Sequence, residues 1–446
     1  MLKKSLTALL LLFVTCFVNA QPVKVWTLDD CIKYAEEHNI DIQKQSLTID
    51  KSNLDLQESR WAFVPSLSAS SGFTSSTGRV LDPTTYQFVQ TNLTSNSSSS
   101  LEGNITLFEG GKKQKNLERA KLSLRASILK EESVKYNLKL NVTSAYLDVL
   151  CALEQEAIAR KSAGLIEIQL ERSQNLFEAG SITESDVLQL RSQLFSAQND
   201  ISSALQAEKM AKLAICDLLE IEDFESFKTA ESQAPEEYMA EADIETAITY
   251  HPDYLISVLN QNLAETDWKI AKSALYPTLS LSAGYGSSWS DARKKSIQNP
   301  DGTIRYEAYP FFEQYADNAS AYVSVGLKIP ILTGLKARNS TIRAQLAVKE
   351  SQYETSEVYK KLRKQVIQAK IDCETARDKY NRAIEEVKYA EEAYRQISDK
   401  YNLGATDYLN WNTALVELAK SQYSLIESKY SFYLKCKILN FYYEQQ

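Results

Sequence analysis

Proline and glycine are scarce in this chain of 446 residues, and their distribution is uneven. The nine prolines leave two long gaps, one between Thr84 and Ala234 and the other after Pro330. The same two gaps hold few glycines. Because proline and glycine interrupt helices, the gaps predict two stretches that are helical over most of their length.

Histidine is nearly absent, and the two that occur, His38 and His251, precede Asn39 and Pro252. A helix boundary explains both positions. No set of residues has metal-ligand spacing, and neither a glycine-rich phosphate loop nor a Ser/His/Asp set occurs. The sequence therefore predicts no metal, no cofactor and no enzymatic activity.

Positive charge is in deficit, with 50 Lys and Arg against 58 Asp and Glu, which gives a net charge of −8. Affinity for nucleic acid depends on neutralising phosphates, so an acidic chain predicts no nucleic-acid partner. Cysteine is also sparse, and after Cys16 the remaining positions are odd in number and irregularly spaced. The pattern predicts buried free thiols on helices rather than a disulfide framework.

Long apolar runs are missing as well. Lys3 and Lys4, the apolar stretch Leu6–Phe13 and the small-residue site Val18–Ala20 predict a signal peptide at residues 1–20. The stretch Leu6–Phe13 is too short to span a bilayer as a helix, and no later run is long enough. We therefore expect an exported chain without a transmembrane helix.

The chain instead contains an internal duplication. The segment SRWAFVPSLSASSGF from Ser59 matches AKSALYPTLSLSAGY from Ala271, and LFEGGKKQKNLERA from Leu107 matches ILTGLKARNSTIRA from Ile331. Such self-similarity has to be recognised before a fold is assigned. It divides the mature chain into a first repeat, residues 21–230, and a second repeat, residues 231–446.

The spacing of glycines inside the repeats points to a rigid element. Gly110 and Gly180 are 70 residues apart, and so are Gly334 and Gly404. Between them, small or apolar residues recur every seven positions in two rows offset by four, which is a coiled-coil seam. The first copy has Leu138, Ala145, Ala152, Ala159 and Ile166 in one row, with Val142, Val149, Ala163, Leu170 and Phe177 in the other; the second copy has Leu362, Ala369, Ala376, Ala383 and Ala390.

The seam predicts two long helices, at about residues 111–178 and 335–402. Each is followed by a return helix, at about 182–219 and 405–442. In front of each long helix the apolar pattern has period two, which is typical of strands with one apolar and one polar face. We expect two β-hairpins, at about 64–108 and 276–331, with strands of about ten residues.

The expected hairpins have polar linkers, from Arg79 to Ser100 and from Asp291 to Asn318. Aromatic residues near the strand ends suggest the girdles found at membrane interfaces. The candidates are Phe73, Trp289, Tyr306, Tyr309, Phe311 and Phe312. Four amphipathic strands cannot close a barrel, and an open sheet edge is not tolerated in lipid, so several chains would have to pool their strands. Two copies would give eight strands and three copies would give twelve.

The duplicated plan, the LFEGG turn, the opening WTLDDCIKYAEEHN from Trp26 and the ending SKYSFYLKCKILNFYY from Ser428 resemble the TolC family of outer-membrane efflux proteins. The resemblance implies an α+β membrane protein that forms a homotrimer. It implies a twelve-stranded β-barrel, four strands per chain, continued by an α-helical coiled-coil tunnel. The expected location is the Gram-negative outer membrane, in contact with its lipid, with an extension into the periplasm.

The resemblance also implies partners and a gate. Channels of this family receive cargo from an inner-membrane pump through a periplasmic adaptor, and they close at the tips of their helical hairpins. The tip turns here are Gly180 and Gly404, and the matching gate residues are Asp186, with Ser185 beside it, and Tyr401. Asp186 equally suits the capping of a helix N-terminus, and both roles stay open.

Family members often carry an acidic constriction just beyond the second tip. The matching positions are Asn410 and Thr413, which are uncharged, so Asp407 is the candidate to replace the acidic ring. A secreted or surface coiled-coil protein is the alternative function, but it leaves the two amphipathic hairpins unexplained. A soluble periplasmic enzyme is a further alternative without a site. The cargo and the class of pump are not encoded in recognisable motifs.

Overall fold

The computed structural model describes residues 25–81, 88–230 and 243–443, so the predicted signal peptide lies outside the described residues. The chain divides into two compact units. The helical unit comprises the described residues up to 48, 128–256 and from 356 onward; the strand unit comprises 49–127 and 257–355. Each sequence repeat contributes to both units, so the compact units are not the repeats themselves.

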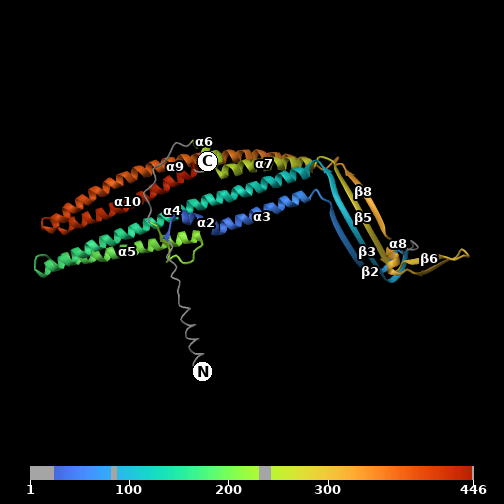
Figure 1. Ribbon diagram of the computed structural model, residues 1–446, viewed down its shortest axis with the longest axis horizontal. Helices are drawn as coiled ribbons and strands as arrows, with labels where there is room; N and C mark the ends of the chain where they lie inside the picture. Colours follow the sequence, from blue (N-terminus) through green and yellow to red (C-terminus); the bar gives the residue numbers. More distant parts are fainter. Residues whose placement is uncertain (1–24, 82–87, 231–242, 444–446) are drawn as a thin grey trace, which may run out of the picture. The chain divides into compact units, whose positions relative to one another are not determined.

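Two pairs of helices dominate the chain (Figure 1). The long helices α4 (Lys112–Glu178) and α9 (Lys336–Asn402) have 67 residues each. The return helices α5 (Glu184–Leu219) and α10 (Tyr408–Tyr443) have 36 residues each. At a rise of 1.5 Å per residue, each long helix is about 100 Å in length. Among the described residues, no helix has a stretch both long and apolar enough to cross a membrane.

The predicted seam is buried along most of the long helices. All of its members from Leu138 to Leu170 are buried, and so are those from Leu362 to Ala383, while Ala390 is partly buried. Alanine at these positions lets neighbouring helices approach closely. The prediction is wrong for Phe177, which is 42% exposed because it lies in the last turn of α4, next to the tip.

An apolar cluster that includes part of the first seam holds strand β1 (Val25–Trp26) and helix α2 (Leu28–His38) in the helical unit. Strand β1 pairs in parallel with β4 (Lys228–Thr229), and α2 follows β1. The Trp26 ring packs in the same cluster as Phe227 and Tyr146. The Tyr146 hydroxyl lies 3.1 Å from each of two acceptors, the backbone carbonyls of Trp26 and Ala230. These contacts tie both short strands to α4.

Shorter helices complete the two repeats. Helix α3 (Ile40–Trp61) precedes the first strands and α7 (Pro252–Ser273) precedes the second, each with 22 residues. Helix α6 (Ile244–Tyr250) precedes α7. The equal lengths of α3 and α7 extend the correspondence between the repeats beyond the long helices.

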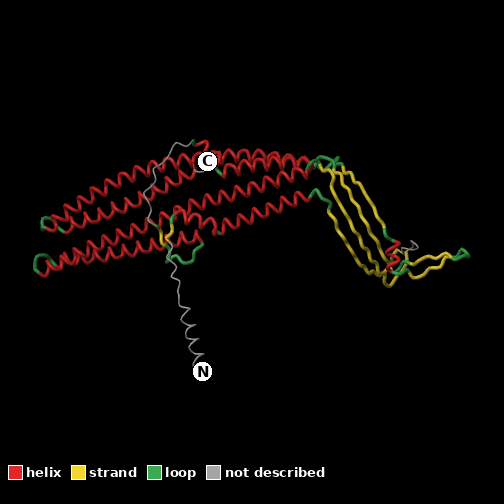
Figure 2. Tube along the Cα trace, viewed as in Figure 1, coloured by secondary structure: helices red, strands yellow, loops and turns green. Residues whose placement is uncertain are grey.

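The strand unit holds one four-stranded antiparallel sheet in the order β2-β3-β5-β8 (Figure 2). Its strands are β2 (Ser66–Leu81), β3 (Phe88–Glu109), β5 (Thr278–Ser290) and β8 (Ser320–Lys328). The two hairpins therefore join through β3 and β5. Within the described chain, the outer strands β2 and β8 each have a single neighbour.

The register gives the sheet one apolar and one polar face, because residues directly opposite each other point to the same side. One row across the four strands is Leu67, Gly103, Ala283 and Val323, and the next is Ser68, Glu102, Gly284 and Tyr322. On the apolar face, side chains are open to the surroundings, and Val323 is 74% exposed. The expected alternation is confirmed in these rows of the sheet. In β3 it is interrupted between Thr106 and Phe108, where the register shifts and Phe108 comes to lie opposite Leu279.

The expected strand length of about ten residues is wrong for β2 and β3, which have 16 and 22 residues. Much of the segment that we expected to be a polar linker continues both strands. There Ser and Thr pair across the ladder, as in the hydroxyl contact of 2.9 Å between Ser71 and Ser99. A run of serines has no alternation of apolar and polar residues, which is the sequence signal for a strand. The predicted strands were therefore too short.

The second expected linker also contains structure. It forms the hairpin β6 (Lys294–Gln298) and β7 (Ile304–Ala308), followed by helix α8 (Phe311–Asp317). The fully buried Gln314 side chain bonds to both the N–H and the carbonyl of Ser290, at 2.5 and 3.0 Å. Of the expected girdle residues, Trp289 and Phe311 pack together here, with ring centroids 5.4 Å apart.

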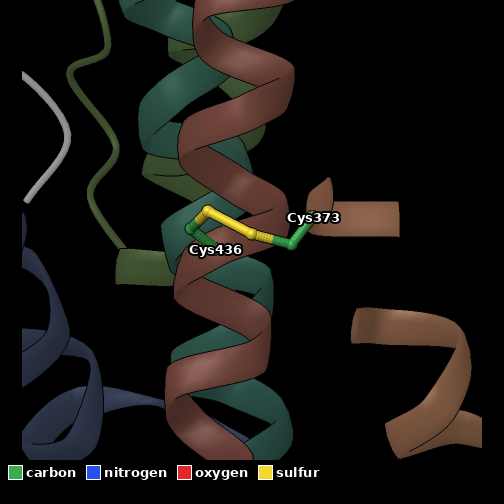
Figure 3. The surroundings of a disulfide bond; sticks show 2 residues. All are labelled: Cys373 and Cys436. Carbon is green, nitrogen blue, oxygen red and sulfur yellow. A yellow bond between two sulfur atoms is a disulfide. The ribbon is translucent and has the colours of Figure 1, made fainter. Parts of the chain in front are cut away.

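The prediction of free thiols is wrong for two of the cysteines. Cys373 of α9 and Cys436 of α10 form a disulfide, with their Cα atoms 5.3 Å apart (Figure 3). Their separation of 63 residues hides the pairing in the sequence, because the two helices must double back before the thiols meet. Cys31, Cys151 and Cys216 are free, and burial raises the pKa of the Cys151 and Cys216 thiols to about 11.

Candidate functional site at the two helix tips

Both helical hairpins turn through the same backbone motif. At the first tip, Gly180 has a φ of 74° and the N–H of Ser181 donates to the carbonyl of Leu176 at 2.8 Å. At the second tip, Gly404 has a φ of 69° and the equivalent bond is also 2.8 Å long. A left-handed glycine after the last helical turn is a common helix C-cap. The two predicted tip turns are thus formed by the predicted glycines.

Asp186 lies at the start of α5 and caps that helix. Its carboxylate accepts hydrogen bonds from the Thr183 N–H at 3.1 Å and from the Thr183 hydroxyl at 2.8 Å. This is the carboxylate half of a capping box, and the negative charge also suits the helix N-terminus. Ser185 is exposed beside it. Within this chain the Asp186 carboxylate therefore serves the capping role.

Tyr401 lies in the last turn of α9, and its ring stacks on that of Trp411 with centroids 5.8 Å apart. Burial raises the pKa of Tyr401, against the opposing effect of hydrogen bonds from Ser173 and Gln169. The hydroxyl is thus directed to α4 of the same chain. These contacts show that Tyr401 packs α9 against α4 and α10. A hydrogen bond between Tyr401 and Asp186 stays a prediction about the assembled protein.

Trp411 is the residue of the tips that sequence reasoning missed. It is 2% exposed, and three tyrosines, Tyr394, Tyr401 and Tyr408, surround it. We call the buried apolar residues around it the tip cluster: Ala163, Ile166, Leu170, Val187, Leu190, Ala197, Trp411 and Leu415. The cluster draws on α4, α5 and α10, so it joins the two hairpins. Heptad spacing from Trp411 to Leu418 was the available signal.

Arg172 of α4 makes a second link between the hairpins. Its guanidinium donates to the side-chain oxygen of Asn402 and, at 2.9 Å, to the backbone carbonyl of Asn402. Asn402 is the last residue of α9. A cation at this place satisfies a terminal carbonyl and complements the negative end of the helix. No spacing pattern marks this contact in the sequence, because its partners are 230 residues apart.

Of the three constriction candidates, Asp407 directly precedes α10, and Asn410 and Thr413 lie in its first turns; all three are exposed. The Asp407 carboxylate accepts from the backbone N–H of Asn410 at 2.9 Å, so it caps α10. The Asn410 amide donates to the Thr406 hydroxyl at 3.1 Å, and the Thr413 hydroxyl donates to a carbonyl of its own helix at 2.8 Å. Asp407 thus supplies the one negative charge among the three candidates.

Farther along the helices, charged groups join α4 to α10. The Glu154 carboxylate accepts from the Lys429 ammonium and from the Tyr430 hydroxyl, both at 2.6 Å. The Tyr430 side chain is buried, and its pKa is raised by burial and by this carboxylate. In the part of the chain that the structure describes, no group of three or more His, Cys, Asp or Glu could hold a metal ion.

Comparison with known families gives one match over most of the chain. The family described as "Outer membrane efflux protein" matches residues 31–219 and 244–435, which covers both repeats and all four strands of the sheet. A coiled-coil stalk would not contain the strands. The match therefore agrees with the resemblance seen in the sequence and not with the alternative function.

Individual relatives are distant. The outer membrane protein TolC of Vibrio cholerae is 24% identical over 264 residues, 56% of this chain and 55% of that protein. The outer membrane efflux protein BepC of Brucella suis is 21% identical over 328 residues, 73% of this chain and 67% of that protein. The match to TolC thus spans about half the length of that relative.

The fold is shared over nearly the full length with solved structures. The outer membrane channel CmeC of Campylobacter jejuni superposes with a TM-score of 0.79 at 15% sequence identity, covering 94% of this chain and 85% of that one. A similar score of 0.79 relates this chain to CusC, at 16% identity. At such low identity the likeness concerns the fold alone.

Proposed function

Because the chain belongs to the outer membrane efflux protein family, we propose that it is the channel subunit of a tripartite efflux or secretion system. In this role the protein gives passive passage to cargo that an inner-membrane pump delivers. A periplasmic adaptor protein joins the pump to the channel. The membrane is the outer membrane, and the helical unit reaches into the periplasm.

The observation that carries this proposal is the open sheet with two unlike faces. Strands β2 and β8 each have one neighbour in the described chain, and an unpaired strand edge is too costly to face lipid. Three copies of the chain would close the edges in a ring of twelve strands, wide enough for a lumen. The apolar face would then meet the membrane lipid and the polar face would line the lumen.

The equal lengths of the paired helices support an origin by duplication. Residues 21–230 and 231–446 would be the two repeats. Since α4 equals α9 and α5 equals α10 in length, both hairpins end at the same level along a tunnel built from them. A tunnel whose helical hairpins all end at one level needs hairpins of equal length.

The tips would form the gate of the tunnel. In the closed state Asp186, assisted by Ser185, would bond to Tyr401 of a neighbouring helix pair, around the turns at Gly180 and Gly404. Asp407, with Asn410 and Thr413, would line the constriction. A hydrogen bond to a charged group contributes roughly 1.5–3 kcal/mol, so three copies would favour closure by several kcal/mol. Opening would need a partner with comparable preference for the open state.

The assembly is tested by native mass measurement of the detergent-purified protein, which should give a trimer. A monomer or a dimer contradicts the twelve-stranded assembly. Channel function is tested by single-channel recording in planar bilayers, where the wild-type protein should give discrete, low-conductance openings. A trimer that never conducts, with or without gate substitutions, contradicts the export role.

The gate is tested by the double variant Asp186→Ala with Tyr401→Phe, which should raise the conductance without loss of the trimer. Thr183→Ala is the matched control, because it weakens the cap of α5 and keeps the carboxylate of Asp186. A capping effect alone would make the control as conductive as the double variant, and that result refutes the gate. Block by divalent cations should be weak after Asp407→Asn.

A further inference from the structure

The strand unit has an unusual charge distribution. Residues 66–76 of β2, 96–106 of β3, 280–290 of β5 and 320–327 of β8 contain a single Asp, Glu, Lys or Arg, and it is Glu102. The remaining residues of the polar face in these segments are Ser, Thr, Asn and Gly, together with Tyr322. One carboxylate thus stands alone on a neutral polar surface.

The surroundings of Glu102 leave its charge uncompensated. Its direct neighbours across the sheet are Ser68 and Gly284. A Cβ at residue 284 would collide with the Tyr322 ring, so that ring lies flat over Gly284 on the same face. Glu102 is exposed, and none of the described residues makes an ion pair or a hydrogen bond with its carboxylate.

The other charged residues of this face lie some distance from Glu102. Lys328 of β8 is six residues beyond Tyr322 and opposite Thr278, whose other neighbour is Glu109. At the foot of the polar face, a hollow of about 610 Å³ is lined by Lys113 and Glu58 among other residues, and the Lys113 ammonium donates to the Thr106 carbonyl at 2.7 Å. Thr106 is four residues from Glu102, roughly 14 Å along the strand. The Debye length at physiological ionic strength is about 8 Å. The field of Lys113 is therefore largely screened at Glu102, and Glu58 offsets it further.

The difference between the apolar and polar faces of the sheet indicates the side to which the Glu102 carboxylate would point in a barrel. A carboxylate turned toward lipid would carry a large desolvation cost, whereas the same group in a water-filled lumen stays hydrated. Glu102 lies on the face opposite Leu101, Val323 and Val325, which are exposed and apolar. In a closed barrel the carboxylate would project into the lumen at the level of the membrane.

We propose, on the basis of the trimeric channel proposed above, that Glu102 contributes one carboxylate per chain to a ring of three inside the barrel. Rings of acidic side chains attract cations and disfavour anions in wide pores. The ring is distinct from the constriction at the helix tips, where Asn410 and Thr413 are uncharged. Glu102 is thereby a selectivity-determining residue for ions and charged cargo in the strand segment.

The test is the reversal potential of single channels under a KCl gradient, with the full-length trimer. At about 0.01–0.1 M salt the Debye length is about 10–30 Å, so a charge in the lumen is felt by passing ions. Glu102→Gln should move the K⁺ over Cl⁻ permeability ratio toward one. The double variant Glu102→Gln with Ser100→Glu returns the charge to the same face, two residues along β3, and should restore the cation preference.

A side-specific blocker separates this ring from the tips. Hexaamminecobalt(III), a trivalent cation, is added to the compartment opposite the one that received the protein, because the polar helices cannot cross the bilayer. Block from this side should weaken in Glu102→Gln and persist in Asp407→Asn. Loss of block in Asp407→Asn alone overturns the proposal.

The experiments distinguish a wrong assignment of Glu102 from a wrong assignment of the channel function. If wild-type and Glu102→Gln trimers conduct equally with the same ion selectivity, Glu102 plays no part in selection and the export role stands. If neither trimer conducts even with the gate substitutions, the proposed function fails and the ring fails with it. Native mass measurement of each variant confirms that the trimer has formed.

Discussion

The two helical hairpins have the same backbone and different side-chain contacts. The fourth residue of α10 is Trp411, which fills the tip cluster, and the fourth residue of α5 is Val187 in the same cluster. A disulfide joins α9 to α10, whereas the corresponding residues of α4 and α5 are Val149 and Lys212. Helix length and turn geometry are thus repeated, but the packing that secures each hairpin is particular to it.

The difference indicates which properties of the duplication are constrained. A one-residue change in a helix would rotate its seam by about 100° and shift its tip by about 1.5 Å, so the lengths must match. A buried contact can be made by many combinations of apolar side chains of suitable volume. We therefore expect single substitutions at Trp411 and at the disulfide to affect the second hairpin more than substitutions at the corresponding positions affect the first.

The largest difference between the hairpins should appear in Trp411→Ala. Truncating a buried tryptophan costs about 3–5 kcal/mol, because a cavity remains. Val187→Ala removes far less apolar surface and should cost about 1–2 kcal/mol. The measurement is denaturant unfolding of each purified variant followed by the helical circular dichroism signal. If both variants lose the same free energy of unfolding, the two hairpins contribute equally to the tip cluster.

Reduction of the disulfide should also affect the second hairpin selectively. A crosslink between cysteines at a sequence separation of 63 contributes about 2–4 kcal/mol. Dithiothreitol should therefore lower the unfolding midpoint of the wild-type protein, and Cys436→Ser should abolish that sensitivity. Cys216→Ser in the first hairpin is the control and should stay sensitive to reductant. Labelling of every cysteine in the denatured, unreduced protein would contradict the pairing.

The regular parts of the fold were predictable from sequence because their periodicities are strong. Seven-residue repetition from Leu138 and two-residue alternation around Leu281 are determined by the geometry of helix and strand. The serine-rich parts of β2 and β3 lack such a signal, since successive residues such as Ser98 and Ser99 point to opposite faces and are equally polar. There the strands are held by backbone pairing, which side-chain patterns do not report.

The tips were predictable only in their turns. Gly180 and Gly404 are marked by the need for positive φ, whereas the partners of Tyr401 come from α4 and α10 and are distant in sequence. The disulfide was missed for the same reason. Long-range contacts depend on the register between helices, and heptad spacing within one helix does not specify that register.

A third comparison concerns the seams. Ala376 of α9 and Ala152 of α4 lie at the same position along their helices, and both are buried. Substitution of either by leucine should cost about 1–3 kcal/mol through overpacking. We expect Ala376→Leu to be milder, because the disulfide already holds α9 to α10 nearby. The readouts are thermal unfolding and the yield of trimer, and an unaffected Ala376→Leu protein would mean that this part of the seam is misassigned.

The smallest effect should come from His251, the C-cap of α6; His38, the last residue of α2, has a nearly equivalent place in the first repeat. His38 is exposed and its ring stacks on Tyr34, with centroids 3.9 Å apart. His251 is 4% exposed and lies between the rings of Tyr136 and Tyr442. The Nδ1 atom of His251 accepts a hydrogen bond from the Asp253 N–H at 3.2 Å, so this nitrogen must be unprotonated to accept.

Burial lowers the pKa of His251 below its ordinary value of 6.5, and the nearby Asp253 carboxylate opposes the shift. Below about pH 6.5 the unfolded chain then binds a proton that the folded chain resists, so stability falls with acidification until the folded-state pKa is reached. Each unit of depression corresponds to about 1.4 kcal/mol. His251→Gln should flatten the dependence of the free energy of unfolding on pH between 7.5 and 5, measured by denaturant unfolding at each pH. If the variant keeps the wild-type slope, other groups carry the acid sensitivity.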